Sequence, residues 1–325
     1  MANVPQGERL KNSSIGFFIF TCIIIIFISN SVFTFPQVLA YGNADLVIVY
    51  FLDVGQGDSI FIDTSGLDVL IDGGPRKAGS FVVDYLNDLG VFHVDLVVAT
   101  HPDADHIGGL ITVLNSSSVV VDTVLFNGEE KDTKTYRDFM AVVDSEELVV
   151  AERGQVYVLA ENVSLIVLNP VQPLEFSDSN DNSVVVKLEV GKVSFLFTGD
   201  VTFEAEESML SAGVNMESDV LKVAHHGSKY STSMEFLDAV NPTYAVISAG
   251  KDNPYGHPHE ETIQRLLSKG VIVYGTFVSG TIKMGTDGEE VKVYGNPEPI
   301  PENFNFTLIL LLILVFVLLV RKVKL

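Results

Sequence analysis

The chain of 325 residues contains one cysteine and no tryptophan. The single thiol, Cys22, lies inside an apolar leader, so the rest of the chain can form no disulfide and offers no thiolate. Any metal ion bound outside the leader must therefore be held by His, Asp, Glu or Asn side chains. Without tryptophan, the core has to rely on Val, Leu, Ile and Phe.

Cations are also scarce, because 20 Lys and Arg residues stand against 42 Asp and Glu residues, which gives a formal net charge of −22. This balance argues against broad nonspecific clamping of nucleic acid, which depends on Lys and Arg. It suits solubility in a salty exterior. Phosphate chemistry stays open, because metal ions at a site outweigh a distant background of charge.

The first 40 residues have the pattern of an export signal. A basic segment precedes a nearly uninterrupted apolar run over 15–33, and Val38 and Ala40 end the segment as small or compact residues. Residues 1–40 therefore predict a secretory signal peptide. Because the apolar run is long for a signal peptide, an uncleaved signal anchor is the alternative.

The C-terminus mirrors this pattern. A Pro-rich spacer, 296–305, leads into the segment 306–325, which is apolar and ends in cations. This order predicts a transmembrane anchor with a basic cytoplasmic tail. It also resembles the sorting signals of some archaeal surface proteins, in which case the tail would be removed. The segment 41–295 is then expected to lie outside the cytoplasm, attached to the cell membrane.

The segment 41–295 is dense in strand signals. Apolar and β-branched runs such as 46–54 and 163–170 alternate with amphipathic helical stretches such as 79–89 and 203–212. No linker-like change of composition divides the segment, so we expect one domain. Strands with interspersed helices predict an α/β or α+β layered architecture.

The stretch LVVATHPDADHIGGL, residues 96–110, carries the strongest chemical signal. An apolar strand ends there in four metal-competent side chains, those of His101, Asp103, Asp105 and His106. Packed together, such groups repel one another or stay poorly solvated unless a cation lies between them. Imidazole and carboxylate suit a divalent ion such as zinc or manganese. A helix-capping turn would explain Asp105 alone and leave the two histidines unexplained.

Two further strands end in candidate ligands. Asp200 closes the run FLFTGD, and His225 and His226 close LKVAHH. Strand ends gather along one edge of a sheet, so these side chains can meet the first cluster in space. The repeated pattern therefore predicts a metal site built from segments far apart in the sequence.

Other polar positions allow two interpretations each. Asp72 follows an apolar run and precedes a Gly pair, so it either caps a turn or supports the metal ligands. In FLDVGQGDS, Asp53, Gln56 and Asp58 either line a cleft or shape a hairpin. In NPYGHPH, His257 and His259 either contact substrate or are ordinary solvated residues, and His257 is the favoured candidate for a functional role.

Together these motifs resemble the metallo-β-lactamase superfamily. HPDADHIGG, FTGD and VAHHGS follow one another in that order, with LDVGQGDS and LIDGG ahead of them. They are more closely similar to the branch related to the C-terminal domain of the ComEC competence proteins. The resemblance covers nearly the whole segment between the two apolar ends. It implies an α/β fold, a four-layer αββα sandwich with a dinuclear metal site at one edge of the paired sheets.

The resemblance also implies ligands for two divalent metal ions, zinc or manganese. They are His101 and Asp103 for the first ion, Asp105, His106 and His225 for the second, and Asp200 between the two. Asp103 stands where the familiar HxHxDH pattern has a second His, and Asn182 stands at the third position of the first ion. Both changes replace a nitrogen ligand of the first ion by an oxygen ligand, so this ion can also be manganese or magnesium.

The expected function is that of a membrane-anchored, extracytoplasmic metal-dependent hydrolase, a phosphodiesterase or nuclease acting on extracellular DNA. In this hypothesis Asp105 orients the nucleophile, and His226 or His257 protonates the leaving oxygen or binds phosphate. Lys222 and Lys229 are the nearby cations for contact with the DNA backbone. A DNA-uptake channel is a candidate partner.

Two alternatives stay open at this point. One is a metallo-hydrolase of small esters, lactones or lactams, because the superfamily fold hosts all of these reactions. The other is a non-catalytic surface module that binds metal or DNA.

Overall fold

The structure, a computed structural model, describes residues 32–33, 46–145 and 147–301. The predicted transmembrane anchor lies outside this part of the chain, and so does the predicted signal segment apart from Val32 and Phe33. Among the described residues, no helix combines the length and the apolar character that a membrane crossing requires.

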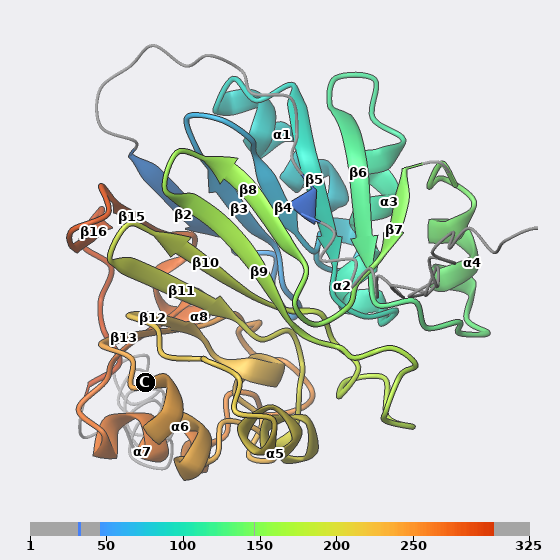
Figure 1. The fold of residues 1–325 in the computed structure, drawn as a ribbon. Coiled ribbons are helices and arrows are strands. Elements are labelled where there is room, and N and C mark those ends of the chain that lie inside the picture. Colours follow the sequence, from blue (N-terminus) through green and yellow to red (C-terminus); the bar gives the residue numbers. More distant parts are fainter. Residues whose placement is uncertain (1–31, 34–45, 146, 302–325) are drawn as a thin grey trace, which may run out of the picture. The chain divides into compact units, whose positions relative to one another are not determined.

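Two mixed sheets form the centre of the described part of the chain (Figure 1). The first sheet contains, in order across it, β1 (Val32–Phe33), β8 (Val156–Ala160), β9 (Val163–Asn169), β10 (Val185–Val190), β11 (Val193–Phe197), β12 (Val220–Lys222), β13 (Tyr244–Ile247) and β14 (Ile272–Gly275). The second sheet contains β16 (Val291–Tyr294), β15 (Ile282–Thr286), β2 (Val47–Phe51), β3 (Ile60–Asp63), β4 (Val69–Ile71), β5 (His93–Ala99), β6 (Val120–Phe126) and β7 (Leu148–Val150).

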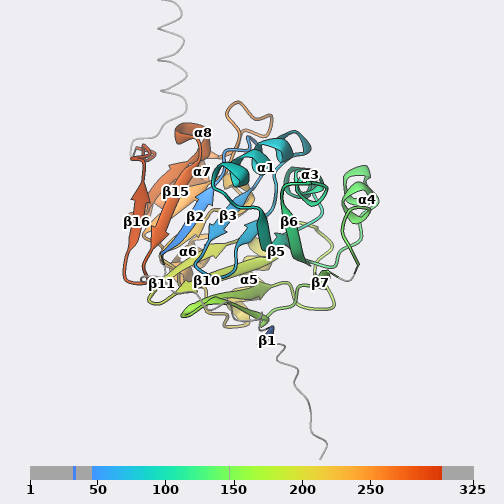
Figure 2. The same cartoon turned by 90° about the horizontal axis from the view of Figure 1, so that it is seen from above.

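The two sheets lie face to face, with β2 and β3 over β10 and β11 (Figure 2). Strand β2 shows how the sequence produces this layer, because side chains alternate between the two faces of a strand. Val49 and Phe51 point into the core between the sheets, where the rings of Phe51 and Phe197 lie 6.2 Å apart. Tyr50 points to the other face, towards the helices. Every residue of β2 is therefore buried.

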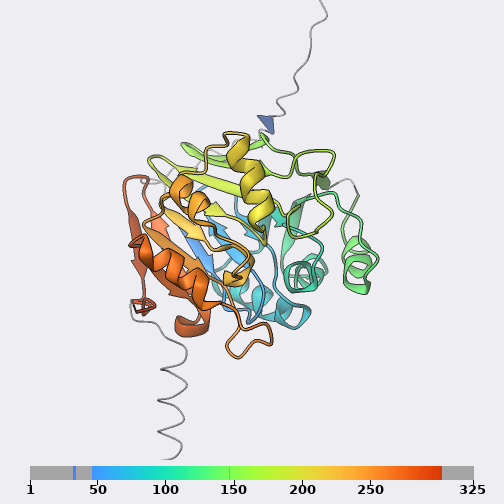
Figure 3. The ribbon, with the colours of Figure 1, turned by 90° about the horizontal axis from the view of Figure 1, so that it is seen from below.

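Helices cover the outer face of each sheet. The first sheet packs against α5 (Phe203–Ser211), α6 (Met234–Val240) and α7 (Glu260–Ser268), which lie side by side in Figure 3. The second packs against α1 (Gly79–Asp88), α3 (Leu110–Leu114) and α4 (Lys134–Met140). Shorter helical turns are η1 (Arg76–Ala78), α2 (Ala104–Ile107), η2 (Ala224–Gly227) and α8 (Thr276–Ser279). The predicted αββα sandwich is confirmed.

The pair Gly108–Gly109 divides the helical segment that follows the HPDADH motif into α2 and α3. A Cβ atom on Gly109 would lie 1.8 Å from the carbonyl oxygen of Gly73, so only glycine allows the two loops to approach this closely. The hydrogen bond from Gly73 N to His106 O, 2.9 Å, joins the same loops. The Gly pair therefore fixes the HPDADH loop against the loop that carries Asp72.

Candidate metal centre

The predicted site residues follow strands whose neighbours run parallel to them. In the second sheet β4, β5 and β6 are parallel, and in the first sheet β11, β12 and β13 are parallel. Carboxyl ends of parallel strands meet at one edge, which is where α/β sheets bind ligands. The HPDADH loop follows β5, Asp200 follows β11, and the two histidines of η2 follow β12.

Four buried residues converge at this edge: Asp58, His106, Asp200 and His226. Each offers one ligand atom, and these atoms all lie within 4.8 Å of one another. We call these four residues the metal cluster. The Nε2 atoms of His106 and His226 each lie 3.3 Å from Oδ2 of Asp200. Asp105 lies beside them, with its Oδ2 3.4 Å from Nε2 of His226.

Several buried atoms of this site have no hydrogen-bond partner among the described residues. They are Nε2 of His101, His106 and His226, and Oδ1 of Asp200. An unpaired buried polar atom costs about 1–3 kcal/mol, so such atoms are rare and need an explanation. Here they belong to imidazole and carboxylate groups, which are the usual ligands of zinc and manganese. The donor set therefore fits a divalent metal ion.

The electrostatics of the site favour positive charge. Burial opposes ionisation of His106, yet the carboxylates of Asp200 and Asp72 raise its pKa well above the usual value. Burial likewise opposes the charge of Asp200, but His226 and His106 hold its pKa well below the usual value. Protons on the histidines provide the positive charge here, and a divalent metal ion would displace those protons when it binds.

Asp72 supports His106 from below. Its Oδ2 lies 2.7 Å from Nδ1 of His106, and Thr100 donates to both carboxylate oxygens, from its hydroxyl at 2.7 Å and from its backbone N–H at 2.9 Å. A carboxylate on Nδ1 fixes the ring and leaves Nε2 for a ligand. Of the two interpretations of Asp72, support of a ligand is the one that the structure shows.

His101 is fully buried, and its ring centroid lies 4.2 Å from that of His106. Burial, together with the neighbouring His106, lowers the pKa of His101 to about 4. The ring is therefore neutral near pH 7 and keeps a lone pair. Its Nδ1 lies 3.3 Å from the hydroxyl of Ser183, which also accepts a hydrogen bond from Asp200 N at 3.1 Å.

The two oxygen ligands expected for the first ion, Asp103 and Asn182, are not among the four residues of the metal cluster and make other contacts. The carboxylate of Asp103 accepts a hydrogen bond from Lys131 and is not part of the metal cluster. The side-chain amide of Asn182 donates to Phe176 O at 2.8 Å and accepts from Phe176 N at 3.3 Å. Asn182 therefore holds its own loop together, and the next residue, Ser183, is the one that reaches His101.

His225 and His226 both adopt left-handed backbone conformations, with φ of 50° and 54°. For residues with a Cβ this conformation costs about 1–2 kcal/mol each, and such strain is typical of functional sites. The left-handed backbone conformation directs the side chain of His226 towards the metal cluster, where the residue is 1% exposed. His225 stays at the rim, with its Nε2 3.9 Å from Asp200 Oδ2. The sequence predicts His225 as the ligand and His226 as the proton donor, whereas the group of residues that could hold an ion contains His226.

A buried ion pair lies behind His226. Lys222 Nζ is 2.6 Å from Oδ2 of Asp58, and both side chains are almost completely buried. The other oxygen of Asp58 lies 3.2 Å from Nδ1 of His226, which also contacts Ser248 O at 3.0 Å. The prediction that Lys222 contacts a DNA backbone is wrong, because the side chain is enclosed in the core. The structure places Asp58 in the site, not merely in a hairpin.

His257 lies next to both histidines of η2. Its ring centroid is 5.5 Å from that of His225 and 6.2 Å from that of His226. Burial and the charges of His226 and His225 lower its pKa to about 4. His259 has a structural contact, because its Nδ1 accepts the backbone N–H of Lys229 at 3.2 Å.

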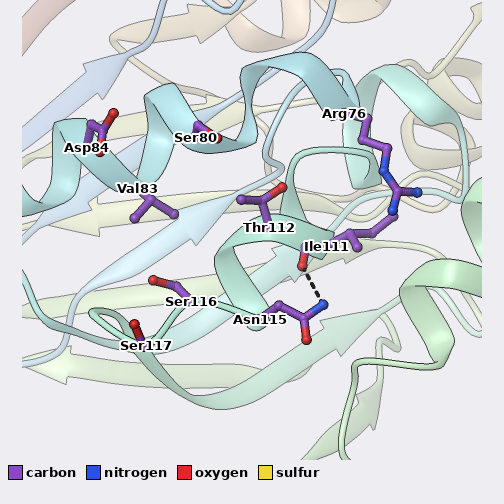
Figure 4. Close-up of a pocket in the computed structure, with 9 residues that line it drawn as sticks. All are labelled: Arg76, Ser80, Val83, Asp84, Ile111, Thr112, Asn115, Ser116 and Ser117. Atoms are coloured by element: carbon purple, nitrogen blue, oxygen red, sulfur yellow. Dashed lines mark hydrogen bonds between the residues drawn. The ribbon is translucent and has the colours of Figure 1, made fainter.

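A surface pocket of about 440 Å³ lies away from this edge, between α1 and α3 (Figure 4). Thr112 and Ile111 line it, and Asn115 donates to the carbonyl of Ile111 at 3.1 Å. None of the predicted site residues lines this pocket.

The chain is similar to known proteins in sequence and in fold. The family model described as the metallo-beta-lactamase superfamily matches residues 52–251. ComE operon protein 3 of Bacillus subtilis (strain 168) is 33% identical over 282 residues, which cover 81% of this chain and 35% of that protein. Competence protein ComA of Neisseria gonorrhoeae is 32% identical over 244 residues, which cover 74% of this chain and 32% of that protein. The chain thus spans about a third of the length of these relatives.

Among solved structures, Igni18, a metallo hydrolase from the archaeon Ignicoccus hospitalis, has a similar fold. The TM-score is 0.50 at 17% identity, and the match covers 73% of this chain and 98% of Igni18. At this level of identity the similarity concerns the fold alone.

Proposed function

The chain belongs to the metallo-beta-lactamase superfamily, and on this premise we propose that it is a metal-dependent phosphodiesterase or nuclease acting on extracellular DNA. The membership, with the similarity to two competence-related proteins, confirms the resemblance that the motifs indicated. The observation that carries the proposal is the convergence of buried, unpartnered imidazole and carboxylate atoms at one sheet edge. The similarity to a competence protein, ComA, favours DNA over other substrates.

Two divalent ions, manganese or zinc, would be held by the residues at this edge. We assign His106, His226, Asp105 and Asp200 to one ion. His101, Asp103 and Asp200 are assigned to the other, as the family pattern implies. When bound, such ions activate a water molecule and neutralise charge on the phosphoryl group. His226 takes the ligand role that the sequence suggested for His225, because it is His226 that lies inside the metal cluster.

The remaining residues position and bind the substrate. Burial opposes the charge of Asp105, but the imidazoles of His226, whose Nε2 lies 3.4 Å from the carboxylate, and of His106 lower its pKa, so Asp105 is ionised and can orient the nucleophile. His257, with a pKa lowered to about 4, is neutral near pH 7 and can donate a hydrogen bond to a phosphate oxygen. His225, at the rim, is then the candidate for protonating the leaving oxygen, in place of His226.

The location belongs to the same proposal. The apolar segments 15–33 and 306–320 support attachment to the cell membrane with the hydrolase on the outer side. The relatives are about three times as long as the matched segment. A DNA-uptake channel is the partner that we propose.

The direct test is a cleavage assay with the full-length chain. Labelled DNA, a chromogenic β-lactam and a chromogenic ester are each incubated with Mn²⁺, with Zn²⁺ and with EDTA. We expect DNA cleavage with metal, none with EDTA, and a loss of at least about 100-fold in His106→Ala. Glu289→Gln, on an exposed ion pair with Lys192, is the control and should cleave normally. Turnover of the ester or lactam without cleavage of DNA would favour the small-molecule hydrolase instead.

A further inference from the structure

Two tyrosines with exposed rings lie on the loops that border the metal cluster. Tyr230 is 61% exposed and Tyr255 is 64% exposed. Their loops pack against each other, because His259 N donates to Gly227 O at 2.9 Å and Lys229 N donates to His259 Nδ1 at 3.2 Å. Exposed aromatic rings on functional loops are a common feature of surfaces that bind unpaired bases.

Tyr255 is connected to the site through stacked rings. Its ring lies 5.8 Å from that of His257 at an interplanar angle of 26°, which is a stacked arrangement. His257 in turn lies 6.2 Å from His226 of the metal cluster. One face of the Tyr255 ring is therefore supported by His257, and the high exposure of the residue leaves ring surface for a ligand.

Two side chains, those of Arg265 and Glu206, hold the loop that carries Tyr230 in one conformation. The guanidinium of Arg265 donates to the backbone oxygens of Lys229, Ser231 and Thr232 at 3.1, 2.9 and 2.9 Å. The buried carboxylate of Glu206 accepts the backbone N–H groups of Thr232 and Ser233.

The backbone of this loop is strained as well. Thr232 has φ of 61°, a conformation that is a genuine outlier for a β-branched residue. Strain of this kind persists only when the surroundings fix it, and it is concentrated at functional sites. The exposed ring of Tyr230 is thus presented from a backbone that is already ordered, so binding through it costs little backbone entropy.

Lys229 supplies the matching charge. Its Nζ lies 5.3 Å from the centroid of the Tyr230 ring, and no carboxylate of the described residues lies within ion-pair distance of it. In a chain with 42 acidic and 20 basic residues, Lys229 is a cation at the rim of the site that remains available for an anionic ligand. A phosphate backbone is the ligand that combines negative charge with stackable bases.

We propose that Tyr230 and Tyr255 stack on unpaired bases on either side of the scissile phosphodiester, while Lys229 contacts the backbone. The site is then selective for single-stranded DNA, because base pairing and stacking in a duplex cover the faces that the tyrosines need. This inference rests on the proposed nuclease function and names the form of DNA that the site accepts.

The test measures binding separately from cleavage. Fluorescence anisotropy of the full-length chain in EDTA compares a labelled 20-nucleotide single strand with a duplex of the same sequence. Each stacked base contributes to single-strand binding, so we expect Tyr230→Ala and Tyr255→Ala each to weaken single-strand binding about 10-fold. Tyr230→Phe and Tyr255→Phe keep the ring and should bind as the wild type does.

Lys229→Ala should lower the salt dependence of log Kd by about one unit.

Phe92→Ala is the matched control. Phe92 is 58% exposed but precedes β5, at the end of that strand opposite to His101. The proposal is supported if Phe92→Ala binds single-stranded DNA as the wild type does, while Tyr230→Ala and Tyr255→Ala bind it more weakly. Equal affinity of the wild type for duplex and single strand overturns it, and so does wild-type binding by both alanine variants. If those variants also cleave DNA normally, only this inference fails. If the wild type neither binds nor cleaves DNA, the proposed function fails first.

Discussion

Asp58 lies between a buried lysine and a histidine of the metal cluster, so it connects the stability of the core to the geometry of the site. Its carboxylate is 2.6 Å from Lys222 Nζ and 3.2 Å from His226 Nδ1. Although burial opposes its charge, Lys222 and His226 lower the pKa of Asp58. The carboxylate of Asp58 therefore contacts both Lys222 and His226 and holds the ring of His226 in place.

Removal of the Asp58 carboxylate should lower the stability of the folded chain. Asp58→Asn leaves the charge of Lys222 buried without a counter-ion, and breaking a buried pair in this way costs about 3–5 kcal/mol. We expect a loss of that size in the free energy of unfolding, measured by urea denaturation of the full-length chain. The double variant Asp58→Asn/Lys222→Met should recover part of it. A loss no larger than that of Glu289→Gln, on the exposed surface, would contradict this account.

Asp68 should make the stability depend on pH. Burial, opposed by a hydrogen bond from Thr64 N and reinforced by the charges of Asp63 and Asp95, raises its pKa to about 7. The folded chain then binds more protons than the unfolded chain, so stability falls as the pH rises from about 4 to about 7.

Asp68→Asn should remove this dependence and raise the stability at pH 8 by more than about 1 kcal/mol. Thermal unfolding at pH 5 and pH 8 measures both effects. Asp88→Asn removes one exposed charge and is the control for net charge. If the stability of the wild type and of Asp68→Asn changed by the same amount between pH 5 and pH 8, Asp68 would not titrate in this range.

Single residues were the hardest to assign from the sequence. The motifs indicated which residue types belong to the site, but they could not separate His225 from His226, because that choice depends on three consecutive left-handed residues ending at Gly227. Asn182 and Ser183 are neighbours on the chain, and only the loop bonds of Asn182 show that Ser183 faces His101. The burial of Lys222 likewise follows from packing of the two sheets.

At the scale of elements, the strands were the most predictable part of the fold. Strands such as β2 and β9 carry continuous or alternating apolar residues, and both are observed where the pattern predicts them. Helix α4 was missed, because its sequence KTYRDFM has little apolar periodicity. The signal that could have found it is its N-cap, Thr133, whose side chain accepts the backbone N–H of Tyr136.

The loop that carries Tyr230 provides a prediction at the same scale. Glu206→Gln replaces one acceptor oxygen by an amide group that cannot accept the backbone N–H of Thr232 or Ser233. Loss of a hydrogen bond to a buried charged group costs about 1–3 kcal/mol. Hydrogen exchange of these two amides should therefore speed up about 10-fold or more. The measurement belongs at pH 8, because burial raises the pKa of Glu206 to about 7.

Glu207→Gln, at the exposed neighbouring position, is the matched control and should leave the exchange unchanged. Equal exchange rates in wild type and Glu206→Gln would mean that Glu206 does not hold the loop.

At the scale of the whole molecule, the site exists only when both sheets are stacked. His106 belongs to the second-sheet half of the sandwich, whereas Asp200 and His226 follow strands of the first. A ligand that binds only the folded chain stabilises it. We therefore expect EDTA to lower the melting temperature of the wild type and to have little effect on His106→Ala. If EDTA lowered the melting temperatures of the wild type and of His106→Ala equally, the stabilising metal ion would be bound at another site.

The measurement that tests the central claim most directly is the metal content of the full-length chain, by mass spectrometry after equilibration with Mn²⁺ or Zn²⁺. The account predicts two bound ions per chain in the wild type, loss of at least one in His226→Ala, and retention in His225→Ala. A wild-type chain that binds neither ion, or a His226→Ala variant with wild-type metal content, would contradict it.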